Sequence, residues 1–156
     1  MTEGSTPDQA GALRRDLVAA LAGFYIGHPD VGRFPMLAEV GEHLTTALTD
    51  DDLATPEAAE LPVARLLAGI EVASDGPGVS SVLSAFAAAA PILRWVQTAA
   101  YKATLSQHFL DNYGYVRVIG PGGLVESSEV SAGLGIWGAG LHYPRHEHPA
   151  EETYHV

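Results

Sequence analysis

The sequence contains no cysteine, which excludes disulfide bonds, zinc sites built on thiolates and a cysteine nucleophile. Basic residues are also scarce, because 8 Lys and Arg stand against 19 Asp and Glu, for a formal charge of −11. Such a charge would repel a phosphate backbone or an anionic membrane surface, so we expect neither nucleic acid nor a membrane as partner. No apolar run approaches the length of a membrane span, and the polar start lacks the features of a signal peptide. The sequence therefore predicts a cytoplasmic protein.

Hydrophobic residues make up 47% of the 156 residues, enough to form the core of one domain. Apolar residues recur at helical spacing in segments that begin near Thr6, Phe34, Leu61, Ser80 and Pro91. The last of these segments is expected to run as a helix to about Leu110, with a possible kink at its proline. We therefore predict an N-terminal helical region over residues 1–110.

From residue 111 the pattern changes to that of β-strands. Residues 113–119 (YGYVRVI) are rich in β-forming residues, and the GPGG that follows reads as a turn. A further strand is expected over 130–137, where glycines at alternate positions are typical of bends in a curved sheet. Trp137, inside this apolar strand, is expected to lie in the core. The whole chain is thus predicted to be α+β, with the β part over residues 111–156.

Four of the seven histidines lie in the last fifteen residues, and two of them form a His-x-His pair. On an extended backbone the side chains of His146 and His148 point to one face, where both imidazoles can reach a single ion. A bend at Pro149-Ala150 can bring Glu152 to the same point, with Tyr154 on the same face as Glu152. Two neutral nitrogens and one carboxylate oxygen suit one divalent transition metal, such as Fe, Zn, Mn, Co or Ni.

The other histidines are weaker candidates for this site. His142 either faces the site or lies in the preceding strand, whereas the alternation of an extended chain points His155 away from it. Structural positions in or beside helices are predicted for His28, His43 and His108. A His-x-His pair by itself is common on acidic surfaces, so the interpretation depends on the complete pattern around it.

That complete pattern, Gly140-x5-His146-x-His148-x3-Glu152, resembles the first motif of the cupin superfamily. The run YPRHEHPAEETYHV at 143–156, with NYGYVRVIGP at 112–121, looks like the metal-binding segment of the cupin-type dimethylsulfoniopropionate (DMSP) lyases. The close match covers residues 112–156, and the helical region is similar in arrangement only.

The resemblance implies a jelly-roll (double-stranded β-helix) barrel that holds one divalent metal and releases dimethyl sulfide from DMSP, leaving acrylate. Carried over residue by residue, it implies metal ligands at His146, His148 and Glu152. It also implies that Tyr154 is the base of the elimination and that Tyr143 orients the substrate or assists. The substrate is a small zwitterionic sulfonium, whose cation aromatic faces can bind. The aromatic residues near the site in sequence are Tyr113, Tyr115, Trp137 and Tyr143.

The sequence departs from the family pattern in two places. The glycine expected after Glu152 is missing, and nothing after Val156 supplies the further histidine of a second motif. An open half-barrel would expose strand edges, so we expect a barrel truncated after its first motif, in a fragment of a longer enzyme.

Two other functions stay open from the sequence. One is another metal-dependent cupin reaction on a small acid, catalysed by a dioxygenase or an isomerase. The other is a sensor or regulator resembling the cupin anti-sigma factors, against which the absence of cysteine counts. The helical region is expected to cover the barrel or to form a homodimer.

Overall fold

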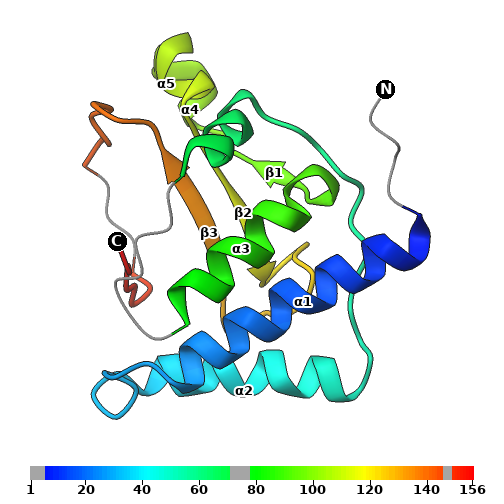
Figure 1. Ribbon diagram of the computed structural model, residues 1–156. Coiled ribbons are helices and arrows are strands. Elements are labelled where there is room, and N and C mark those ends of the chain that lie inside the picture. Colours follow the sequence, from blue (N-terminus) through cyan, green and yellow to red (C-terminus); the bar gives the residue numbers. More distant parts are fainter. Residues whose placement is uncertain (1–5, 71–77, 146–148) are drawn as a thin grey trace.

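A computed structural model describes residues 6–70, 78–145 and 149–156. Helices pack against one face of a small antiparallel sheet, which makes the chain a mixed α and β structure (Figure 1). Within the described residues, no helix has both the length and the apolar character that crossing a membrane requires.

Two long helices form the first layer. The helices are α1 (Pro7–Ile26) and α2 (Pro35–Thr49), and they pack along each other. α1 begins where the sequence predicted, because Thr6 caps it: the hydroxyl accepts a hydrogen bond from the Gln9 N–H, and the Gln9 side chain accepts one from the Thr6 N–H. Proline at the first helical position of each helix suits the fixed backbone angle there.

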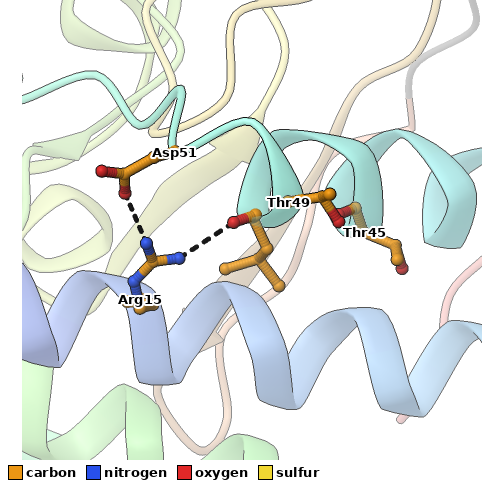
Figure 2. Close-up of polar contacts among 5 residues, drawn as sticks. Arg15, Thr45, Thr49 and Asp51 are labelled. Carbon is orange, nitrogen blue, oxygen red and sulfur yellow. Dashed lines mark hydrogen bonds and ion pairs between the residues drawn. The ribbon is translucent and has the colours of Figure 1, made fainter.

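A side chain of α1 also contacts the C-terminal end of α2. Figure 2 shows Arg15 reaching from α1 to that end, where it donates to the carbonyl of Leu48 at 3.1 Å and pairs with Asp51. Asp51 adopts a positive φ of 56°, which ends the helical course of the chain. The ion pair is largely exposed, so the close packing of the two helices rests on their apolar faces rather than on this pair.

The prediction of a helix from Pro91 to about Leu110 is wrong. The preceding helix, α3 (Val79–Ala89), matches its prediction and is followed by one 3₁₀ turn, η2 (Ala90–Ile92), after which the chain becomes extended. Trp95 and Val96 then form β1 (Trp95–Val96), pairing with Val116 and Tyr115. The remaining helical pattern is realised only as α4 (Tyr101–Thr104) and α5 (Gln107–Asp111).

Pairing with a distant strand overrides local helix preference in this segment. Trp95 is buried beside Phe86 of α3, with ring centroids 5.3 Å apart, and its indole N–H donates to the carbonyl of Ala90. A helix through this segment would give up that burial and the pairing with Val116. The segment expected to be helical from about Leu61 is likewise tighter than an α-helix, a 3₁₀ helix η1 (Pro62–Gly69).

The sheet has the order β1-β2-β3, with β2 (Tyr113–Ile119) in the centre and β3 (Ala132–Trp137) beside it. Both longer strands confirm the strands predicted from the sequence. The register places Tyr113 opposite Trp137 and Tyr115 opposite Gly135, so these four residues share one face of the sheet.

Alternating glycines in β3 have a steric reason. A Cβ at Gly133 would lie 2.2 Å from the carbonyl oxygen of Val116, and one at Gly135 would lie 2.6 Å from the ring of Trp137. The indole of Trp137 therefore folds over Gly135, where a larger residue would collide with it.

Residues from the helices and from the sheet share a single hydrophobic core. Leu17 and Val18 of α1, Leu44 of α2 and Val118 of β2 are all fully buried in it, and Phe86 of α3 is 2% exposed. The helical layer is therefore fixed against the sheet, and both contribute to the pocket described next.

Candidate active site

A pocket of about 840 Å³ lies between the helices and the sheet face that carries Tyr113 and Tyr115. The helices give it an apolar wall, with side chains such as Phe24 of α1, Val40 of α2 and Leu83 of α3. Strands β2 and β3 form the opposite wall. The C-terminal segment, residues 149–156, contributes residues 151–156 to the lining, and Figure 1 shows it in red on the side of β3.

Five aromatic rings contact one another beside this pocket, and we call them the aromatic cluster: Tyr101, Phe109, Tyr113, Trp137 and Tyr143. All of them except Phe109 line the pocket. Tyr143 touches all the others, with ring centroids at 5.6 Å from Trp137, 5.8 Å from Tyr113, 6.1 Å from Tyr101 and 6.4 Å from Phe109. Rings in this arrangement offer π faces that can bind a cation.

The sequence predicted that Trp137 lies in the core, and the structure contradicts this. Trp137 is 39% exposed and lines the pocket, because the register with Tyr113 turns it to the pocket face of the sheet. Its neighbour Ile136, on the opposite face, is the residue that enters the core.

A network of hydroxyl groups fixes the phenol of Tyr143. It is hydrogen-bonded to the phenols of Tyr101 and Tyr113, and the Tyr113 hydroxyl lies 3.1 Å from the hydroxyl of Thr98. Burial, followed by the hydrogen bond to Tyr101, raises the pKa of Tyr143 well above its usual range. Burial also raises the pKa of Tyr113, although its hydrogen bonds to Thr98 and Tyr143 oppose this. Both phenols therefore stay protonated at neutral pH.

Tyr154 and Glu152 are in direct contact on the C-terminal segment. The chain bends at Pro149 and Ala150, as expected, and the Tyr154 hydroxyl then donates to Glu152 Oε1 at 2.7 Å. Partial burial of the hydroxyl, then this hydrogen bond and the carboxylate charge, raise the pKa of Tyr154 to about 12. Both side chains line the pocket, and Tyr154 is 57% exposed overall.

Two of the three predicted metal ligands, His146 and His148, lie outside the described residues. Among the residues that the structure does describe, no group of three His, Cys, Asp or Glu could hold a metal ion. Glu152 is the predicted ligand that the structure places, and it lies in the pocket lining. A carboxylate oxygen in that position has the chemistry that a divalent transition metal accepts.

The structure changes the position expected for one histidine. His155 lines the pocket instead of pointing away, with its ring 5.2 Å from Phe24 and 5.8 Å from His28. Residues 149–156 form no strand, so the alternation on which that expectation rested does not apply. His142 is exposed in the loop after β3.

The three histidines predicted to be structural do not line the pocket. His28 accepts a hydrogen bond from the Asp30 N–H at 3.2 Å, which places it at the turn after α1. His43 of α2 lies 3.6 Å from the carboxylate of Glu129. His108 belongs to the short helix α5.

Sequence reasoning missed three residues of the pocket region: Tyr101, Phe109 and Arg117. The first two were assigned to a long helix that the structure does not contain, and nothing local distinguished them from other helix residues. Arg117 lines the pocket with its guanidinium 5.9 Å from the ring of Tyr115, and it donates to the carbonyl of Pro121 at 2.8 Å. Its alternation with Tyr113 and Tyr115 in the predicted strand was the one available signal, because it places all three side chains on one face.

Comparison with known proteins places this pocket in context. Residues 36–156 match the family model described as dimethylsulfoniopropionate lyase. The dimethylsulfoniopropionate lyase DddQ of Ruegeria pomeroyi is 36% identical over 78 residues, which are 49% of this chain and 38% of that protein.

Among solved structures, a chain from the crystal structures of the DMSP lyases RdDddP and RnDddQII is similar in fold. The TM-score is 0.64 at 24% sequence identity, over 85% of this chain and 62% of the other. In both comparisons the match spans less than two thirds of the relative's own length.

Proposed function

This chain belongs to the dimethylsulfoniopropionate lyase family, and we propose that the protein cleaves DMSP to dimethyl sulfide and acrylate. A base removes a proton from the carbon next to the carboxylate. The electron pair of that C–H bond forms the new C=C bond, and the C–S bond breaks with its electrons leaving on sulfur. The reaction needs no oxidant or reductant.

The contact between Tyr154 and Glu152 inside the pocket carries this proposal. It joins the predicted base to a predicted metal ligand at 2.7 Å, in a pocket that Tyr143 also lines. The aromatic cluster beside it suits the sulfonium end of the substrate, because cations bind to aromatic faces.

We assign the two pocket tyrosines different roles. Tyr143 stays protonated and uncharged, so its hydroxyl orients the substrate by hydrogen bonding and does not act as a base. Tyr154 is the base that accepts the proton. Because the Glu152 carboxylate contributes to the raised pKa of Tyr154, a cation held by Glu152 would lower that pKa toward a useful range.

We propose one divalent metal, Fe, Zn, Mn, Co or Ni, with His146, His148 and Glu152 as its ligands. When bound, it would act as a Lewis acid toward the substrate carboxylate, next to the carbon that loses its proton. The chemistry of the donor set, two imidazoles and a carboxylate, supports this proposal.

We further propose that residues 111–156 form the first part of a cupin barrel, together with β1, which pairs with β2. The helices before β1 would then act as its cover, which the apolar wall of the pocket from α1, α2 and α3 supports. The same helical region is the surface through which a homodimer would form.

The decisive experiment is a headspace assay for dimethyl sulfide with metal-loaded protein and DMSP. We expect product from the unchanged protein and its loss after chelation of the metal. An absence of product with every candidate metal would contradict the proposed substrate, and oxygen consumption with a small acid would favour a dioxygenase instead.

A further inference from the structure

Tyr101 is the residue of the aromatic cluster that lies farthest from the predicted catalytic segment in sequence. It begins the four-residue helix α4, and its half-buried side chain lines the pocket. Its ring meets Tyr143 edge-on, with centroids 6.1 Å apart and an interplanar angle of 84°. It also contacts Phe109 and Tyr113 at 5.9 and 5.7 Å, so its own position is fixed from two sides.

The hydroxyl of Tyr101 belongs to a set of uncharged groups around Tyr143. A phenol donates one hydrogen bond and can accept others. The two phenols bonded to Tyr143 are Tyr101 and Tyr113, and Tyr113 is held in turn by Thr98. Since no group in this set carries a charge, it fixes where the Tyr143 hydroxyl lies without drawing away its proton.

Tyr143 otherwise belongs to a segment with little regular structure. Residues 138–145 contain no helix or strand, so backbone pairing does not fix the Tyr143 side chain. The surrounding rings and hydroxyls therefore contribute to its orientation, and Tyr101 supplies both a ring and a hydroxyl.

We propose that Tyr101 is a positioning residue that holds Tyr143 in the orientation in which Tyr143 meets the substrate. The inference rests on the proposed function, because it assumes that Tyr143 orients a small zwitterionic substrate. It assigns a role in the site to the helical region beyond that of an apolar cover.

Removing only the hydroxyl tests this role. Tyr101→Phe keeps the ring contacts and loses the hydrogen bond to Tyr143. The loss of one neutral hydrogen bond predicts a rise in KM of about three- to tenfold. Because Tyr101 does not touch the reacting atoms, kcat is expected to change by less than about twofold.

The experiment compares unchanged protein, Tyr101→Phe, Tyr143→Phe and the double variant. A matched control is Thr104→Val, which removes a hydroxyl from the same helix, where it donates to the carbonyl of Ala100 at 3.1 Å. Two readouts are taken: the kinetics of dimethyl sulfide release, and binding of 3-(trimethylammonio)propionate followed by tryptophan fluorescence. The second readout uses Trp137, 5.6 Å from Tyr143, and does not need turnover.

The double variant separates positioning from a general effect on structure. We expect Tyr101→Phe to weaken binding of the probe and to have no further effect once Tyr143 is phenylalanine, with Thr104→Val unchanged. Additive effects of the two substitutions, or a Tyr101→Phe protein with unchanged KM and probe affinity, would overturn the inference.

Failure of the proposed function gives a different result. If the unchanged protein binds the probe but releases no dimethyl sulfide, the proposed reaction fails, while the binding cycle still decides the role of Tyr101. If the unchanged protein neither binds the probe nor releases product, both proposals are overturned.

Discussion

The α1–α2 layer and the C-terminal segment are held in place by different kinds of contact. The helices bury whole apolar side chains against each other and against the sheet, with Leu17 and Leu44 fully inaccessible. The C-terminal segment has neither helix nor strand, its residues are exposed, and a hydrogen bond between Tyr154 and Glu152 is among its contacts. Stability and chemistry should therefore respond to substitutions in different parts of the molecule.

The largest expected effect is a loss of activity without a loss of stability. Tyr154→Phe removes the proposed base and should lower kcat by about 100- to 10,000-fold. Because Tyr154 is 57% exposed, the free energy of unfolding should stay nearly unchanged. Dimethyl sulfide release and urea denaturation measured on the same preparation check both parts. Unaltered activity would remove Tyr154 as the base, and a large loss of stability would break the contrast.

A substitution in the α1–α2 layer should instead lower the stability of the protein. Leu44→Ala leaves a cavity among fully buried neighbours and should cost about 2–5 kcal/mol of unfolding free energy, measured by urea denaturation. The neighbouring Thr45→Ala is a control, because Thr45 is exposed and its hydroxyl donates to the carbonyl of Gly41 within its own helix. Equal losses from the two substitutions would contradict the placement of the core.

The glycines of β3 line the pocket, and substituting them distinguishes a clash with backbone from a clash with a movable side chain. Gly133→Ala places a Cβ against the Val116 carbonyl and should cost about 1–3 kcal/mol of stability. The nearest atoms to a Cβ in Gly135→Ala belong to the movable ring of Trp137, so its cost should be smaller, but it should displace the indole and shift the tryptophan fluorescence. A larger loss of stability from Gly135→Ala, seen in urea denaturation, would contradict this steric order.

The smallest effect concerns the cap of α1. Thr6→Ala removes the capping hydroxyl and should cost about 1 kcal/mol, seen as a lower midpoint in urea. Thr6→Ser keeps the hydroxyl and should recover most of the loss. Neither substitution should change KM, because Thr6 does not line the pocket.

Local signals predicted the parts of the fold that depend on local chemistry. The cap at Thr6 and the prolines marked where α1 and α2 begin, and β-forming residues marked β2. The same reasoning failed for residues 91–110, because the strand at Trp95 depends on pairing with Val116 and on burial against Phe86. No property of the local sequence shows such partners.

In the candidate site, too, contacts between residues close in sequence could be predicted and contacts between distant residues could not. The contact between Glu152 and Tyr154 is close in sequence, and the spacing of the two residues suggested that they share a face. The position of Tyr101 beside Tyr143 depends on how the chain returns through α4, so spacing could not predict it. The roles of His146, His148, Glu152 and Tyr154 remain predictions from the motif.

The contact between Phe24 and His155 has a consequence for the order of folding. The α1–α2 pair forms from contacts between neighbouring segments, which close at little entropic cost and favour early formation. The ring of His155 meets Phe24 only when the last residues of this sequence reach the end of α1. During synthesis from the N-terminus, the helical layer can thus form before the last wall of the pocket exists. The helices would then serve as a template on which the residues of the site are assembled.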